Sequence, residues 1–129
     1  WGESDSHTSG ILRDNVRELC GLETGVIKCD VSHFLKRQSE AGEVYDIVFA
    51  DPPYHPKSGK PGRREEAGLA EDPGQALLGR ADLVSILAPG GWVIYERAAA
   101  GGGDEYACWV LIRDRTYGQT RVQIFRREE

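Results

Sequence analysis

The sequence predicts an α/β fold in which a mostly parallel sheet ends in an antiparallel hairpin. Helical and strand-like patterns alternate over most of the 129 residues, and such alternation is typical of a parallel sheet flanked by helices. The last two strand patterns are separated only by Tyr117-Gly118-Gln119, which is short enough for a hairpin turn. Because no repeat or linker interrupts the chain, we expect residues 1–129 to form a single domain.

In the first part of the chain, the opening residues 1–10 are small and polar and predict a flexible tail. A helix is predicted over residues 11–22, because apolar side chains recur there at helical spacing and Gly21 supplies a stop. The elements expected next are a strand over residues 26–30, a helix over residues 31–38 and an apolar strand over residues 45–50.

The second part begins with residues 55–73, where prolines, glycines and dense charge predict an irregular loop. Helical spacing returns over residues 75–87, and Ala88-Pro89-Gly90-Gly91 predicts a turn into the next strand. The strands expected after the loop are residues 92–96, 106–113 and 120–125.

The most informative feature is Asp51-Pro52-Pro53-Tyr54, which directly follows the apolar strand over residues 45–50. In open α/β sheets, ligands bind at the carboxyl ends of the strands. Two prolines stiffen the loop and leave its carbonyl groups without local donors. An acid, a carbonyl and an aromatic ring held together suit a flat ring that bears an exocyclic amine. The alternative is a plain Asp-Pro turn.

This tetrapeptide resembles motif IV of the S-adenosylmethionine-dependent amino-methyltransferases, which methylate exocyclic nitrogens of adenine, cytosine or guanine. The resemblance implies that the Asp51 carboxylate and the Pro52 carbonyl accept hydrogen bonds from the target amine. It implies that Pro53 stiffens the loop and that Tyr54 stacks on the base. It also implies a Rossmann-like class I methyltransferase sheet and S-adenosyl-L-methionine as the cofactor.

Other segments resemble one subgroup, the bacterial methyltransferases that act on guanine N2 of small-subunit ribosomal RNA. They are Leu12-Arg13-Asp14-Asn15, residues 26–30, the Pro-Gly-Gly turn with its following strand over residues 87–96, and the Tyr-Gly-x-Thr hairpin within residues 115–120. The likeness extends from Ile11 to Arg127. It implies that Asp30 and Val31, together with Asp51, contact the cofactor. Asp30 is also placed to cap the helix that follows it.

The chain departs from this family at its start. No apolar strand with a glycine-rich loop precedes Ile11, and no strand pattern leads into Glu3 or Asp5, the two acids available to bind the cofactor's ribose. We therefore expect a methyltransferase sheet that lacks its first strand or strands. The chain contains no methionine, so we also expect it to be a piece of a longer protein. Two alternatives stay open: an amino-methyltransferase of DNA adenine or cytosine, and a non-catalytic fragment that has lost cofactor binding.

The residues around and after the tetrapeptide are candidates for binding the RNA substrate. They are Tyr54, His55, Lys57, Lys60 and Arg63. Basic side chains in this loop would contact phosphates, although the acidic residues that follow are equally typical of a solvated loop. Because RNA-binding domains are usually basic, the net charge of −5 calls for a local basic patch, a basic segment missing from this chain, or a target partly covered by protein. The resemblance implies ribosomal RNA or the small ribosomal subunit as the partner.

The remaining expectations concern metals, membranes and compartment. The three cysteines and three histidines form no metal-ligand spacing, so we expect no metal. Buried free thiols and the lack of a long apolar segment predict a cytoplasmic protein without a membrane span. We expect a monomer.

Overall fold

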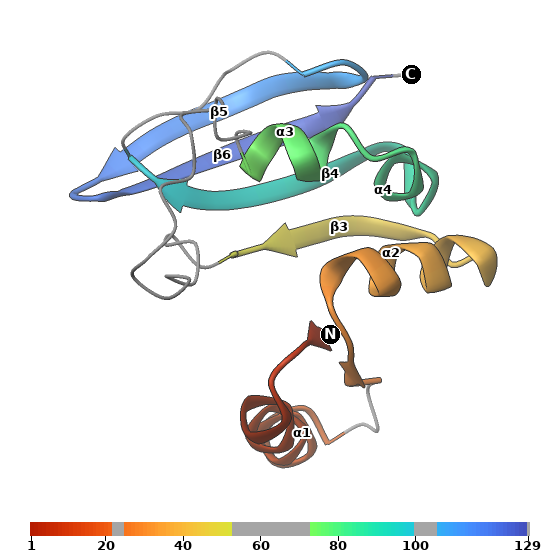
Figure 1. Ribbon diagram of the computed structural model, residues 1–129. Coiled ribbons are helices and arrows are strands. Elements are labelled where there is room, and N and C mark those ends of the chain that lie inside the picture. Colours follow the sequence, from red (N-terminus) through yellow and green to blue (C-terminus); the bar gives the residue numbers. More distant parts are fainter. Residues whose placement is uncertain (22–24, 53–72, 100–105, 129) are drawn as a thin grey trace, which may run out of the picture. The chain divides into compact units, whose positions relative to one another are not determined.

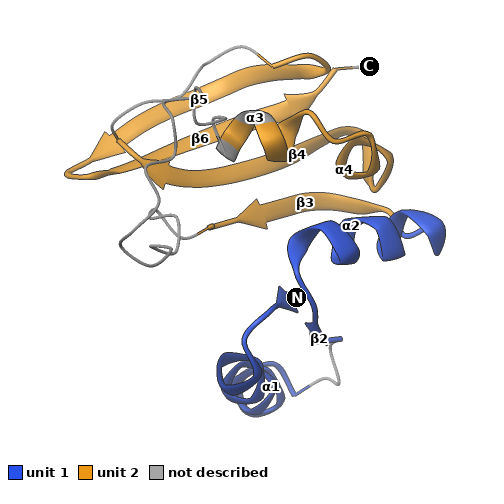
Figure 2. Ribbon diagram, viewed as in Figure 1, with its two compact units in different colours: residues 1–43 blue, residues 44–129 orange. Residues whose placement is uncertain are grey.

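The computed structural model describes residues 1–21, 25–52, 73–99 and 106–128 (Figure 1). These residues fall into two compact units, residues 1–43 and residues 44–129 (Figure 2). Each unit has its own sheet. The expectation of a single domain stays a prediction.

The first unit is built around a short parallel pair of strands. Strand β1 (Gly2–Glu3) pairs with strand β2 (Ile27–Lys28). The pairing is extended by the amide of Cys29, which donates a 3.0 Å hydrogen bond to the Glu3 carbonyl. Helix α1 (Ser6–Cys20) connects the two strands and helix α2 (Val31–Glu40) follows β2. This order confirms the predicted helix–strand–helix pattern.

The prediction of a flexible tail over residues 1–10 is wrong, because these residues form β1 and the first turn of α1. The helix begins at Ser6 because Asp5 is its N-cap, and the Asp5 carboxylate accepts a 2.7 Å hydrogen bond from the Thr8 amide. The first helical turn is polar, so apolar periodicity alone placed the start five residues too late, at Ile11. Gly21 ends the helix in the left-handed conformation, with φ at 62°, which confirms the predicted stop.

The second unit holds a four-stranded sheet in the order β3-β4-β6-β5. Its strands are β3 (Tyr45–Ala50), β4 (Leu87–Ala98), β5 (Trp109–Tyr117) and β6 (Thr120–Arg127). Strand β3 is parallel to β4, whereas β4–β6 and β5–β6 are antiparallel. Gly118, with φ at 61°, lies in the turn between β5 and β6. The structure therefore confirms the α/β class with a closing antiparallel hairpin, although parallel pairs do not outnumber antiparallel pairs among the described residues.

The predicted turn at residues 88–91 forms a wide bulge within strand β4. Tyr45 pairs with Leu87 and the next pair along β3 is Ile47 with Trp92, so residues 88–91 lie opposite one residue of β3. At Gly91 a Cβ atom would stand 2.8 Å from the Ala88 carbonyl oxygen. Only glycine fits there without a backbone shift.

The predicted long helix over residues 75–87 is instead two short helices, α3 (Pro73–Leu78) and α4 (Ala81–Ser85). Gly79, a poor helix former, lies at the break. Arg80 follows it in an extended conformation and donates hydrogen bonds of 2.8 and 2.6 Å to the Asp82 carboxylate. Of the apolar pattern that predicted this helix, Leu78, Ile86 and Leu87 are in the core, whereas Ala81 is exposed.

In the second unit, helices pack on one face of the sheet, whereas apolar residues are exposed on the other. Helices α3 and α4 lie over one face (Figure 1), where Val93, Tyr95 and Phe125 are fully buried. On the opposite face Ile47 is 58% exposed and Phe49 is 62% exposed. Among the described residues, the apolar core of this unit therefore lies on the helix-covered side.

The three cysteines are free thiols. The expectation that they are buried is wrong for Cys20 and Cys108, which are exposed, because Cys20 is on the solvent side of α1 and Cys108 precedes β5. No helix in the described part of the chain is long and apolar enough to span a membrane.

Candidate functional site

Asp51 and Pro52 lie at the carboxyl end of β3, as the sequence predicted, and β3 has the predicted bounds Tyr45–Ala50. Asp51 is exposed and Pro52 is half-buried. The strand stops here because proline removes the amide donor that a continued ladder would need. The acid and the Pro52 carbonyl are therefore consecutive on a stiff segment at the ligand-binding edge of a parallel pair.

The neighbouring strand brings a second acid to the same edge. Ala50 pairs with Tyr95, so the next residues along the two parallel strands are Asp51 and Glu96. Desolvation raises the pKa of Asp51 above its ordinary value, and the charge of Glu96 raises it further. An Asp51 carboxylate in this setting is a better hydrogen-bond and proton acceptor than an ordinary aspartate.

The other predicted residues of this loop lie outside the described residues. They are Pro53, Tyr54, His55, Lys57, Lys60 and Arg63. Their roles in base stacking and phosphate binding stay predictions.

In the first unit, Asp30 follows β2 and caps α2. One carboxylate oxygen accepts a 2.9 Å hydrogen bond from the His33 amide, and the other lies 2.6 Å from the His33 ring nitrogen Nδ1. The amide hydrogen bond is the main reason why the pKa of Asp30 is lowered. The capping role is thereby confirmed. Val31 begins the helix and is 57% exposed.

Glu3 is a candidate that sequence reasoning undervalued. The expectation that no strand leads into Glu3 is wrong, because β1 ends there and pairs with Lys28 of β2. Its carboxylate accepts a 3.0 Å hydrogen bond from the Asp5 amide. Glu3 and Asp30 therefore stand at the carboxyl ends of two neighbouring parallel strands. A two-residue strand leaves no periodic pattern, so only the pairing with β2 reveals it.

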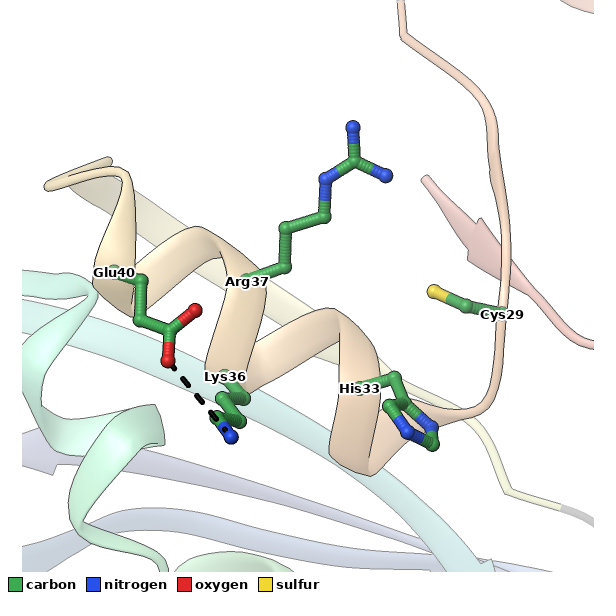
Figure 3. A pocket seen from close by; sticks show the side chains of 5 residues that line it. All are labelled: Cys29, His33, Lys36, Arg37 and Glu40. Atoms are coloured by element: carbon green, nitrogen blue, oxygen red, sulfur yellow. Dashed lines mark ion pairs between the residues drawn. The ribbon is translucent and has the colours of Figure 1, made fainter.

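A shallow depression of about 430 Å³ lies beside α2 (Figure 3). It is lined by Cys29, His33, Lys36, Arg37 and Glu40. Lys36 and Glu40 form an exposed ion pair of 3.9 Å. None of the predicted site residues lines this depression, and nothing in its lining assigns it a ligand.

Among the described residues, no group of three or more histidine, cysteine, aspartate or glutamate side chains is arranged to hold a metal ion. The expected absence of a metal therefore stays a prediction.

Comparisons with known proteins identify the fold and the family. The family model described as conserved hypothetical protein 95 matches residues 2–65, about half of the chain. A search of curated proteins found no match.

Three solved structures illustrate the likeness. A candidate methyltransferase from Escherichia coli, yhhF, is 27% identical with a TM-score of 0.67, over 98% of this chain and 61% of that one. A candidate methylase from Haemophilus influenzae is 21% identical with a TM-score of 0.70, over 99% and 71% of the two chains. A candidate methyltransferase in complex with S-adenosylhomocysteine is 14% identical with a TM-score of 0.65, over 97% and 38%.

The chain spans about three fifths of the length of the first solved structures that it matches, 61% of the Escherichia coli protein and 58% of a Thermus protein. The part it spans has the Rossmann-like α/β sheet of the methyltransferase fold, with a closing antiparallel hairpin. The chain belongs to the conserved hypothetical protein 95 family.

Proposed function

We propose that this protein transfers a methyl group from S-adenosyl-L-methionine to an exocyclic amine, guanine N2 of small-subunit ribosomal RNA. The observation that carries the proposal is the position of Asp51-Pro52 at the carboxyl end of β3, beside the parallel strand β4. In an α/β sheet of this kind, ligands bind at that edge. The likeness of the fold to candidate methyltransferases supports the same reaction class.

The residues at this edge would act by orientation rather than by covalent chemistry. The Asp51 carboxylate and the Pro52 carbonyl only accept hydrogen bonds, so they would take the two N–H groups of the target amine. This arrangement directs the nitrogen lone pair away from the base ring and toward the incoming methyl group. Positioning of this kind removes much of the barrier for a reaction between two bound molecules.

The cofactor supplies the activated methyl group on its sulfonium. The acids Glu3 and Asp30, at the ends of parallel strands, fit the hydroxyl and amine donors of its adenosine part, because ionised carboxylates accept hydrogen bonds. Glu3 would take the ribose hydroxyls and Asp30, with Val31 beside it, the adenine amine. His33 is 79% exposed at its side chain, so it can turn away from Asp30 when the amine binds.

The RNA target is the finer part of the proposal. The Tyr117-Gly118-Gln119-Thr120 turn, which joins β5 to β6, supports the guanine-N2 subgroup over the DNA methyltransferases. Because the net charge is −5, we propose that a local basic patch of Lys57, Lys60 and Arg63 contacts the phosphates of ribosomal RNA, free or in the small ribosomal subunit. We propose that the protein acts as a cytoplasmic monomer.

Calorimetric titration with S-adenosylhomocysteine is the first test, followed by transfer of a labelled methyl group to small subunits, protein-free ribosomal RNA and duplex DNA. We expect binding and transfer to the small subunit. Asp51→Ala is expected to abolish transfer while Asp46→Asn, a change at an exposed acid of the same strand, leaves it intact. No cofactor binding at millimolar concentration would favour the non-catalytic fragment, and transfer to DNA alone would replace the RNA assignment.

A further inference from the structure

Asp51, the residue that directly follows β3, and Glu96 of the parallel strand β4 are acids at the same edge of the sheet. The pairs Phe49–Ile94 and Ala50–Tyr95 fix the register, and the next step along each strand is Asp51 and Glu96. Side chains alternate between the faces of a sheet, so Glu96 lies on the face of Ile94 rather than on the helix-covered face of Tyr95. Glu96 is half-buried, and its charge is a cause of the raised pKa of Asp51.

Arg97, the next residue of β4, makes buried polar contacts on the helix-covered face. Arg97, which is 7% exposed, donates a 3.0 Å hydrogen bond to the Tyr106 hydroxyl and a longer one of 3.4 Å to the Gln123 side chain. These contacts stabilise the helix-covered side of the sheet. Glu96 instead places a like charge beside Asp51, which disfavours ionisation of Asp51.

Two acceptors side by side match one nucleobase edge better than the others. In guanine the exocyclic amine at C2 is next to the N1–H group, so the edge presents donors from two adjacent atoms. In adenine and cytosine the ring nitrogen next to the exocyclic amine has a lone pair and accepts. An ionised carboxylate only accepts hydrogen bonds, so it pairs with guanine N1–H and is repelled by the ring nitrogen of adenine or cytosine.

We propose that Glu96 accepts a hydrogen bond from guanine N1–H while Asp51 and Pro52 bind the 2-amino group. The inference rests on the proposed function and deepens it, because it names the residue that selects guanine. Sites that hydrogen-bond a polar group of the correct substrate discriminate strongly against analogues that lack it, since a site group is then left unpaired. Glu96 is half-buried rather than fully buried, so the discrimination should be moderate.

The test uses the full 129-residue chain and two short single-stranded RNAs that differ at one base. One carries guanine and the other carries 2-aminopurine, which keeps the 2-amino group but has an unprotonated N1. Affinities are measured by fluorescence anisotropy with a label at the RNA end. We expect the parent chain to prefer guanine by about tenfold, the factor that corresponds to 1.4 kcal/mol.

Three variants make the result specific. Glu96→Gln is expected to reduce the preference for guanine to within about twofold, because an amide can donate to the 2-aminopurine N1 as well as accept from guanine. Glu96→Asp is expected to keep part of the preference, and Asp46→Asn to keep all of it. Circular dichroism confirms that each variant is folded.

The outcomes separate the inference from the function on which it rests. If the parent bound both RNAs with equal affinity and Asp51→Ala bound neither, the role of Glu96 would be overturned. The proposed function would still stand. An unchanged preference in Glu96→Gln would overturn it as well. Failure of the parent to bind either RNA or S-adenosylhomocysteine would contradict the proposed function itself.

Discussion

The indole nitrogen of Trp109 donates a 2.7 Å hydrogen bond to the carbonyl oxygen of Leu78, at the end of α3. Both residues are buried, with Trp109 7% and Leu78 1% exposed. The bond joins the first strand of the closing hairpin to the helix that covers the sheet. It also satisfies a carbonyl group at a helix end, where no intrahelical donor is available.

Replacing Trp109 by phenylalanine keeps most of the apolar contact but leaves the Leu78 carbonyl without this donor. A buried polar group that loses its partner costs about 1–3 kcal/mol, so Trp109→Phe should lower the free energy of unfolding by that amount. Urea denaturation followed by circular dichroism measures the change. Trp92→Phe is the control, because Trp92 is 41% exposed. An equal loss in both variants would show that the hydrogen bond is not the cause.

Gly91→Ala should destabilise the second unit. The new Cβ atom would stand 2.8 Å from the Ala88 carbonyl oxygen and 3.1 Å from that of Asp46, and both are backbone atoms that move only if the bulge between β3 and β4 is remade. Overpacking of this kind costs about 1–3 kcal/mol. Thermal unfolding measures the effect.

Gly10→Ala serves as the matched control for Gly91→Ala. Gly10 lies inside α1, and its added Cβ would meet no atom within 4 Å. Alanine should therefore stabilise the helix by about 0.5–1 kcal/mol. A similar shift in both variants would contradict the crowding argument at Gly91.

Much of this fold follows from the sequence where a pattern is long or ends in a strong signal. The strand over residues 45–50 has its predicted bounds because its apolar run meets Asp51 and Pro52, and proline cannot continue a ladder. The hairpin is predictable because a glycine lies between its two strand patterns. In the structure this residue, Gly118, has the positive φ of a turn, 61°. The first strand of the hairpin nevertheless begins at Trp109, three residues later than the predicted Tyr106.

The features that the sequence did not reveal depend on pairing between distant segments. Strand β1 has two residues and is recognisable only by its partner β2. Asp51 and Glu96 are neighbours because of the register of β3 against β4. The wide bulge at residues 88–91 shifts this register by several positions. No local pattern encodes that shift, so the second acid of the candidate site could be found only from the sheet.

The raised pKa of Asp51 predicts an unusual effect of pH on stability. Because the folded state holds the Asp51 proton more tightly than the unfolded state does, this residue favours folding below its unfolded pKa. That contribution is lost as the pH rises from about 3.8 through the higher folded value. Asp51→Asn cannot ionise, so above this range it should be at least as stable as the parent.

Melting temperatures at pH 3.5 and pH 7 would test the Asp51 prediction. Relative to the melting temperature of the parent, that of Asp51→Asn should be higher at pH 7 than at pH 3.5. A shift in favour of the parent would mean that its carboxylate is stabilised in the folded state, contrary to the desolvation and the charge of Glu96.

For the ion pair of Asp114 and Arg121 we expect the opposite effect of pH on stability. The Arg121 guanidinium donates a 2.9 Å hydrogen bond to Asp114 and is the main reason why the pKa of Asp114 is lowered. The pair therefore stabilises the hairpin above the ordinary pKa of 3.8, and this contribution is lost as the pH falls through the lower folded value. Arg121→Gln should lower the melting temperature at pH 7 and have little effect near pH 2. Arg126→Gln, at an exposed position, should change stability little at either pH.

Asp30 offers a way to separate helix capping from cofactor binding. Serine at this position can still accept a hydrogen bond from the His33 amide as an N-cap, whereas alanine cannot, and loss of the cap destabilises the helix. Asp30→Ser should therefore retain the stability that Asp30→Ala loses. If the Asp30 carboxylate also binds the adenine amine, both variants should lose affinity for S-adenosylhomocysteine equally, because the serine hydroxyl is shorter and uncharged. Chemical denaturation and calorimetry of the same samples give both quantities. Affinity that follows stability across the two variants would show that Asp30 acts on the cofactor only through the helix.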